Sequence, residues 1–222
     1  MKKIIKDIRL YKSETGASFS DSFTDKKLNA IIMRIVMKLR EKEFSLGEFD
    51  HIYIIFTTRD IPKKMVLSNE VDRYHPWYRS CTVSLEKDIY NNLGAPETYE
   101  CIINSLNAVL TTYFTTDDFD KTQIINCITQ AVELGKNMLI KYKEKITSKR
   151  KAIILLRYLD TCMFRPLLRI YDTEDNLLFE KDLPETLTLD SIGNIQVSTK
   201  QITIKPKKNA FMKQEEPVIF VY

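Results

Sequence analysis

The chain has 222 residues, a length that suggests one domain or two small lobes. Hydrophobic residues make up 44% and charged residues 29%, as in ordinary globular proteins, so extended disorder is not expected. The net charge is +4, from 34 basic and 30 acidic residues, and this excess is too small to indicate a dedicated nucleic-acid binder.

The first 14 residues, MKKIIKDIRLYKSE, carry Asp7 and Arg9 inside their apolar stretch. This argues against a signal peptide. No apolar run approaches the roughly 18 residues of a membrane-spanning helix. The expected location is therefore cytoplasmic.

Period-2 alternation and β-branched runs predict strands in the first part of the chain, and spacings of three and four predict a helix. These elements are a strand over 4–11, a loop over 12–23, a helix of about 18 residues that begins after Thr24 or Asp25, and strands over 51–56 and 78–85.

Two helices are expected in the middle of the chain. The first covers about 96–114 and begins at Pro96, which suits a first helical turn because it lacks an N–H. The second begins with a capping box at Asp120 and Gln123 and continues to about 146 along an apolar stripe. The short acidic loop between them predicts an antiparallel helix hairpin.

The last third of the chain is mostly β. Residues 151–159 fit either a strand or a helix, and the connections that follow are too short for parallel crossovers. The expected antiparallel strands are 167–172, 177–183, 187–189, 195–198, 201–205 and 218–222.

The predicted fold class is α+β. It combines an antiparallel or mixed sheet with an N-terminal helix, a central long helix hairpin and a C-terminal β-meander. A single domain over 1–222 is expected, with a lobe boundary near 147–150 left open.

Several kinds of chemistry lack their motifs. No two of the five glycines lie closer than 31 residues, so a phosphate-binding loop is excluded. His51 and His75 have no cysteine at the spacing of a zinc site. The acidic groups at 117–120 and 172–175 fit a helix N-terminus and a turn better than a nuclease metal site. We expect no cofactor and no metal, and an enzyme is less favoured than a binding protein.

The cysteines are expected to be free thiols buried as small hydrophobic side chains. A Cys81–His75 catalytic pair would need an orienting group that the sequence does not identify. The four positions are Cys81, Cys101, Cys127 and Cys162.

One segment, 72–79 (DRYHPWYR), is unusually rich in aromatic and arginine side chains and holds the only tryptophan. These residue types are enriched at binding hot spots and can also stack on bases. The alternative is a loop-to-strand junction in which Trp77 plugs the core. The candidate binding residues are Arg73, Tyr74, His75, Trp77, Tyr78 and Arg79.

Two lysine-rich segments, 141–151 and 205–208, are a weaker candidate. Cations are favoured at a helix C-terminus and in solvated loops, so these segments support nucleic-acid binding only if they share one face.

The helix pair over 96–146 and the C-terminal segment LLRIYDTEDNLLFEKDL (167–183) together resemble the layout of immunity proteins from bacterial polymorphic-toxin systems. The resemblance implies a non-catalytic protein that binds and neutralises a cognate toxin domain. It assigns no residue. Immunity proteins that mask nucleases tend to be acidic, and the charge of +4 departs from that pattern. A nucleic-acid binder and an enzyme with a dispersed site remain the alternatives.

Overall fold

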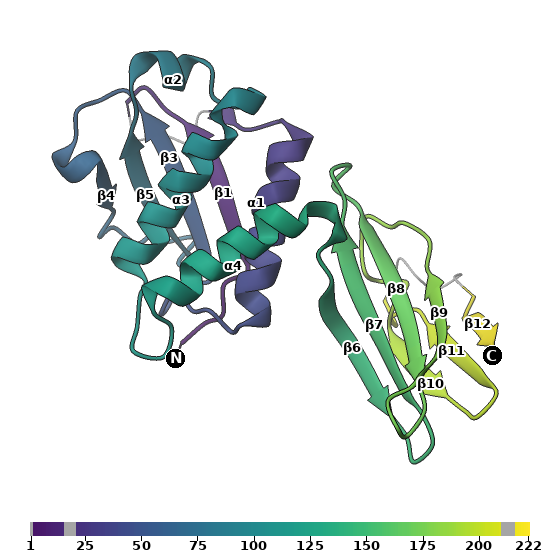
Figure 1. Cartoon of the computed structure of the whole chain (residues 1–222). Coiled ribbons are helices and arrows are strands. Elements are labelled where there is room, and N and C mark those ends of the chain that lie inside the picture. The colour runs from purple at the N-terminus through teal and green to yellow at the C-terminus, as the bar shows by residue number, and fades with distance from the viewer. Residues whose placement is uncertain (1, 16–20, 210–215) are drawn as a thin grey trace. The chain divides into compact units, whose positions relative to one another are not determined.

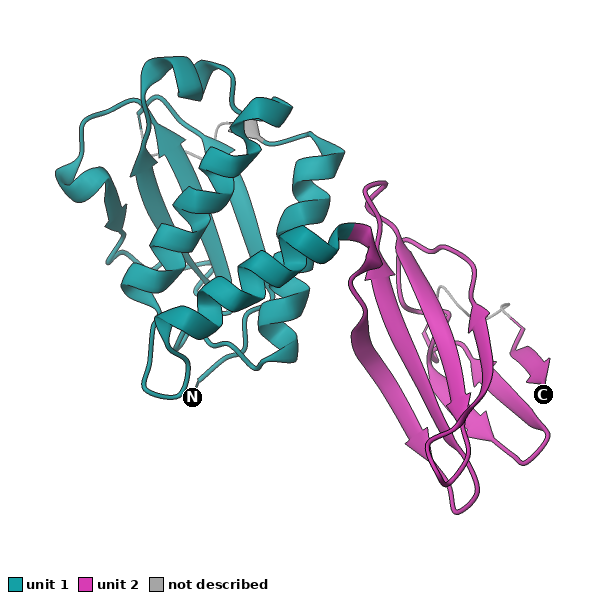
Figure 2. Ribbon diagram, viewed as in Figure 1, with its two compact units in different colours: residues 1–135 teal, residues 136–222 magenta. Residues whose placement is uncertain are grey.

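The computed structural model of the chain describes residues 2–15, 21–209 and 216–222. It divides into two compact units, Met1–Gly135 (unit 1) and Lys136–Tyr222 (unit 2), as coloured in Figure 2. The sequence suggested a boundary near 147–150. Those residues instead form a turn inside unit 2, where the Thr147 N–H donates to the Arg150 carbonyl at 2.8 Å.

Unit 1 holds a sheet, four α-helices and short 3-10 turns (Figure 1). Its elements are β1 (Asp7–Lys12), β2 (Asp21–Ser22), α1 (Lys26–Glu41), β3 (His51–Thr57), η1 (Pro62–Lys64), β4 (Met65–Leu67), β5 (Tyr78–Ser84), α2 (Lys87–Asn91), η2 (Pro96–Thr98), α3 (Tyr99–Tyr113) and α4 (Lys121–Leu134).

The strand order of the unit 1 sheet is β2-β1-β3-β5-β4. The three central strands run parallel, and the two edge strands run antiparallel to their neighbours. Parallel neighbours need crossover connections, and α1 supplies the one between β1 and β3. The sheet is therefore mixed, which is one of the two arrangements that the sequence allowed.

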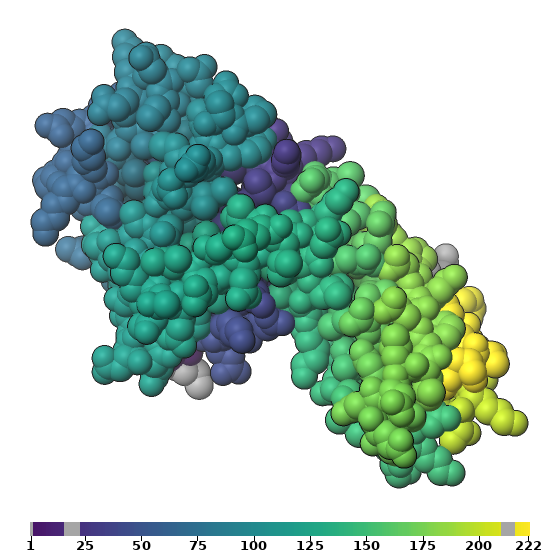
Figure 3. Space-filling model, viewed as in Figure 1, coloured from purple at the N-terminus to yellow at the C-terminus, as the bar shows by residue number. Residues whose placement is uncertain are grey.

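The helices cover one face of this sheet. In Figure 1, α3 and α4 lie across the strands, and in the space-filling view their side chains close over them (Figure 3). Helix α1 packs against both β1 and α4, so it belongs to the same layer. The strand residues that face the helices, such as Ile52, Ile54 and Cys81, are fully buried.

The helix starts predicted near residues 25 and 120 are confirmed, whereas Pro96 begins the 3-10 turn η2 and α3 itself starts at Tyr99. Asp25 caps α1 by accepting the Leu28 N–H at 2.7 Å. Asp120 and Gln123 form the expected capping box at α4. The predicted end of the second helix, near residue 146, is wrong. Helix α4 stops at Leu134, because Gly135 takes a left-handed φ of 51°, and residues 140–146 form a strand.

A 3-10 turn, η3 (Gly135–Asn137), leads into unit 2, whose other regular elements are all strands over the residues that the structure describes. Its strands are β6 (Ile140–Ile146), β7 (Lys151–Tyr158), β8 (Phe164–Tyr171), β9 (Leu177–Asp182), β10 (Asn194–Val197), β11 (Gln201–Lys205) and β12 (Val218–Val221). They form an antiparallel sheet in the order β6-β7-β8-β9 and a second in the order β10-β11-β12.

The two sheets of unit 2 pack face to face over a shared apolar core. Ile154 and Leu168 of the first sheet and Ile202 of the second are fully buried. At one side the rings of Phe179 and Phe220 lie 6.0 Å apart. Residues 187–189, expected to be a strand, form a bend instead, in which the Thr186 hydroxyl donates to the Thr188 carbonyl at 2.7 Å.

The α+β class is therefore confirmed, with the antiparallel meander of the last third in place. None of the helices that the structure describes has both the length and the apolar character that crossing a bilayer requires.

Candidate functional site

The amino ends of β1, β3 and β5 meet at one edge of the unit 1 sheet because these strands are parallel. Their register places Asp7 beside His51 and His51 beside Tyr78. Two residues further on, Arg9 lies beside Tyr53. Side chains alternate along a strand, so all five project from the face opposite the helices.

The segment before β5 is held in a defined turn by Asp72. Its Oδ1 accepts the N–H groups of Tyr74 (2.7 Å) and His75 (2.9 Å), and its Oδ2 accepts the Tyr78 hydroxyl at 3.1 Å. These bonds hold the pKa of Asp72 below its usual range, and the bond from the Tyr74 N–H has the largest effect. Burial and the bond to Asp72 raise the pKa of Tyr78 to about 12. The turn is thus held by three hydrogen bonds to one side chain.

Aromatic rings are stacked over this edge. Tyr53 and Tyr78 lie parallel, with centroids 4.3 Å apart and planes at 12°. Trp77 hydrogen-bonds to the Tyr53 hydroxyl, and His75 meets the Trp77 ring edge-on at 4.8 Å. We call Tyr53, Tyr74, His75, Trp77 and Tyr78 the aromatic surface.

Part of the aromatic surface is open to solvent. Tyr74 is 80% exposed and Trp77 is 38% exposed, and His75 is exposed as well. Trp77 therefore does not plug the core. Its main chain supports the sheet, because its carbonyl accepts the N–H groups of Asp50 (3.0 Å) and His51 (3.2 Å).

The six candidate residues from the sequence do not all lie together. Tyr74, His75, Trp77 and Tyr78 share the aromatic surface, and Arg73 is exposed in the same turn. Arg79 points to the opposite face of β5, where its guanidinium lies 4.4 Å from the Phe49 ring centroid. Their role in binding stays a prediction.

Sequence reasoning missed a buried carboxylate beside this surface. Asp50 lies 2.8 Å from Lys6 Nζ, and its Oδ1 lies 2.5 Å from His51 Nδ1. Burial acts to raise the pKa of Asp50, but the bonds from Lys6 and His51 bring it below its usual range.

Tyr53 and Arg9 were missed too. The Arg9 guanidinium lies 5.4 Å from the Tyr53 ring centroid, a cation–π distance. The period-2 pattern of 4–11 and the run at 51–56 placed both residues on strands. The sequence does not indicate which strands pair with each other, because the partners in a parallel sheet come from distant parts of the chain.

The structure offers no support for cysteine chemistry at this site. Cys81 is fully buried and faces the helices, and burial raises the pKa of its thiol to about 12. His75 is exposed on the other side of β5, so the two do not form a pair. All four cysteines are free. Across the described residues, no group of three or more His, Cys, Asp or Glu side chains is arranged to hold a metal ion.

The lysine-rich segments of unit 2 are partly neutralised. Lys143 points inward, and its Nζ donates to the carbonyl of Ile192 at 3.0 Å and to that of Gly193. The two segments approach each other here, because the Gly193 N–H donates to the Lys205 carbonyl at 2.7 Å. Burial and the charge of Lys207 lower the pKa of Lys143. Three more lysines pair with carboxylates: Lys141 with Glu144, Lys151 with Asp175, and Lys207 with Asp190.

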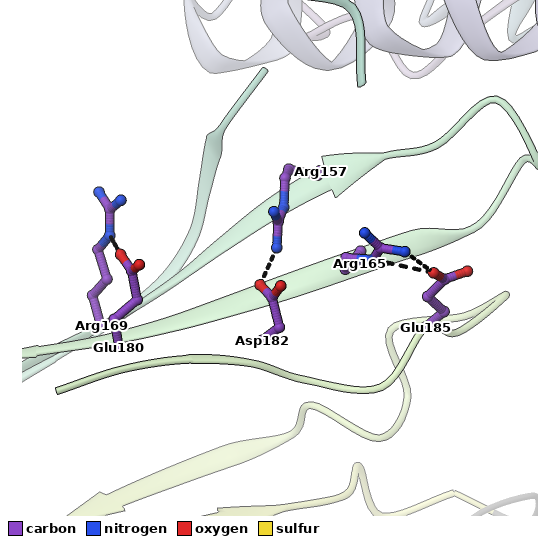
Figure 4. A network of polar contacts seen from close by, with 6 residues as sticks. All are labelled: Arg157, Arg165, Arg169, Glu180, Asp182 and Glu185. Atoms are coloured by element: carbon purple, nitrogen blue, oxygen red, sulfur yellow. Dashed lines mark hydrogen bonds and ion pairs between the residues drawn. The ribbon is translucent and has the colours of Figure 1, made fainter. Parts of the chain in front are cut away.

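The outer face of the first unit 2 sheet carries three arginines, and each contacts a carboxylate (Figure 4). Such cross-strand pairs stabilise the sheet modestly and leave little charge for an anionic ligand. The pairs are Arg157 with Asp182, Arg165 with Glu185, and Arg169 with Glu180.

Fold and site together define an α+β protein whose most distinctive surface is a rigid, partly exposed group of aromatic rings at the edge of a parallel sheet. No family model matches the chain, and neither the curated proteins nor the solved structures include a match to it.

Proposed function

We propose that this chain is a non-catalytic binding protein that uses the aromatic surface of unit 1 to hold a protein partner in the cytoplasm. The observation that carries the proposal is the solvent exposure of Tyr74 and Trp77 on a turn fixed by Asp72. Tyrosine and tryptophan dominate binding hot spots, and a turn ordered in advance loses little entropy on association.

A protein partner fits this surface better than a nucleic acid. The carboxylate of Asp72 is bonded to the Tyr78 hydroxyl within the aromatic surface and would repel phosphates. Six of the lysines and arginines of unit 2 are engaged in ion pairs, which reduces the charge that they offer to phosphates. The resemblance to immunity proteins keeps its C-terminal segment 167–183, although its second helix ends at Leu134 and not near 146. It suggests a toxin domain as the partner.

The test compares partner capture by the wild-type chain with capture by a Tyr74→Ala, Trp77→Ala double variant. Tagged full-length protein is used to capture its partner from nuclease-treated native lysate. We expect the double variant to lose at least about 2 kcal/mol of binding free energy, the size of a hot spot. Thermal unfolding should change little, because Tyr74 and Trp77 are partly exposed.

Leu187→Ala is the matched control, since Leu187 is 72% exposed in unit 2 and far from the turn in sequence. It should bind like the wild type. The captured partner should also be toxic when expressed alone and harmless when expressed with this chain. Equal capture by the double variant and the wild type would refute the aromatic surface as the contact. A partner with no toxicity would refute the immunity role and leave the binding role intact.

A further inference from the structure

A second feature of unit 1 is a cavity of about 630 Å³ at the amino edge of the sheet. The segment 2–6 forms one wall, and the last turn of α1 and the start of β3 form the others. Its lining residues are Lys2, Lys3, Ile4, Ile5, Lys6, Arg40 and Asp50.

The backbone of the first wall is anchored. The Lys3 N–H donates to the Gly47 carbonyl at 2.7 Å, and the Ile5 N–H donates to the Phe44 carbonyl at 2.9 Å. The Ser45 hydroxyl donates to the Lys3 carbonyl at 2.9 Å. These bonds fix the positions from which the lysine side chains reach the cavity.

The charge around this cavity is strongly positive. Four of the lining residues are cationic and one is a carboxylate. That carboxylate, Asp50, is already engaged by Lys6 and His51. Lys2 pairs with Asp118 at 3.3 Å, outside the lining. Among the described residues, Lys3 and Arg40 have no carboxylate within ion-pair distance.

A helix end accounts for only part of this arrangement. Arg40 lies in the last turn of α1, where a cation interacts favourably with the helix dipole. The dipole does not account for the lysines that meet Arg40 from a separate segment. A guanidinium and ammonium groups around one hollow are suited to carboxylates, which arginine can bind through two parallel hydrogen bonds.

The cavity also adjoins the aromatic surface. Asp50 lines the cavity, and its N–H donates to the Trp77 carbonyl at 3.0 Å. Its neighbour His51 meets the ring of Tyr53 edge-on. One partner could therefore cover both features, with apolar contacts at the rings and charged contacts at the rim, as in protein interfaces generally.

We propose that this cavity receives acidic side chains of the protein partner, with Lys3 and Arg40 as their main contacts. The proposal rests on the proposed function, because it names the chemistry of the same partner. It implies a partner with at least two carboxylates beside the apolar patch that meets the rings. The net charge of +4 suits such an acidic partner.

The test uses full-length protein and a fluorescein-labelled hexaglutamate peptide, followed by fluorescence anisotropy at low salt. We expect Lys3→Gln, Arg40→Gln to weaken peptide binding at least about 10-fold, because both unpaired cations are lost. The control is Lys87→Gln, Lys121→Gln, which removes the same charge from exposed positions of α2 and α4 in the same unit. It should weaken binding by less than about 2-fold, as expected for screened long-range attraction.

Three results would overturn the inference. These are no saturable binding of hexaglutamate by the wild type, an equal loss in the control variant, or tighter binding of a short oligonucleotide or inorganic phosphate at the same two residues. The Tyr74→Ala, Trp77→Ala variant should bind hexaglutamate like the wild type, since neither residue lines the cavity.

That comparison separates the two proposals. If the aromatic variant still captures the partner while Lys3→Gln, Arg40→Gln loses hexaglutamate, the aromatic surface fails and the cavity stands. If the aromatic variant loses the partner while the charge variant keeps both the partner and the peptide, the cavity alone fails.

Discussion

Asp50 is the residue on which the amino edge of the sheet depends. Its side chain is buried, and it joins the N-terminal segment to β3 through Lys6 and His51. Its main chain joins β3 to the aromatic turn through Trp77. A buried carboxylate is tolerated here because both of its oxygens have partners.

We expect Asp50→Asn to reduce stability at pH 7 by about 1–3 kcal/mol, because a charged acceptor is lost from a buried network. Asp50 has a lower pKa in the folded chain than in the unfolded chain. Its stabilisation is therefore complete above the unfolded pKa, about 3.9, and is lost as the pH falls through the folded pKa. Urea unfolding of both proteins at neutral and at progressively more acidic pH measures this.

The wild type and the variant should converge in stability as the solution becomes acidic. Asp118→Asn is the control, because Asp118 is exposed and its pair with Lys2 should contribute about 0–1 kcal/mol at most. If the difference in unfolding free energy between Asp50→Asn and the wild type stays constant with pH, the carboxylate charge is not the cause of the lost stability.

At the scale of residues, the sequence identified which side chains were unusual but not how they group. The residue types of segment 72–79 indicate a candidate site. The rings of His75, Trp77 and Tyr78 do group around Tyr53, and Tyr74 lies in the same turn. Arg79 was grouped with them although alternation along β5 sends it to the other face. Tyr53, Asp50 and the cavity depend on strand pairing and could not be seen in one sequence.

At the scale of elements, helix α4 has a start that the local sequence encodes and an end that distant contacts decide. Its start is encoded locally by Asp120 and Gln123, which satisfy each other's backbone N–H groups at 2.8 and 2.7 Å. We expect Asp120→Ala to cost about 1 kcal/mol, within the 0.5–2 range of lost N-caps. Asp120→Asn keeps the acceptor and should restore most of the stability. Urea unfolding distinguishes the three proteins, and equal losses for Ala and Asn would contradict the capping explanation.

The end of α4 was misread for a physical reason. Met138, Tyr142 and Ile146 continue the spacing of four from Leu134, so the sequence predicts a helical stripe that runs past Gly135. Tyr142 and Ile146 also belong to IKYKEKI, which alternates with period two and forms β6. Leu134 and Ile146 are exposed, so the apparent stripe is not one buried face. Short segments that satisfy both periods are decided by tertiary pairing, here with β7.

At the scale of the whole molecule, the two units differ in architecture and each has its own core. Unit 1 is a mixed sheet with helices on one face, and unit 2 is a pair of antiparallel sheets. The sequence located the change from helical to β structure but placed the lobe boundary near 147–150, which lies between two strands of one sheet. The mistaken helix end accounts for this difference.

We expect fragments 1–135 and 136–222 to fold separately, because each retains all the strands of its sheets. Each should show a cooperative unfolding transition, and the second should have a β-type circular dichroism spectrum.

A cut between Arg150 and Lys151 is the matched control. It separates β6 from β7, whose pairing runs from Ile140 with Leu156 to Ile146 with Lys151, and it removes the buried Ile140 from the core. Fragment 151–222 should therefore fail to fold or should aggregate through the exposed edge of β7. Cooperative folding of 151–222, or its absence in 136–222, would place the boundary of the second folding unit elsewhere.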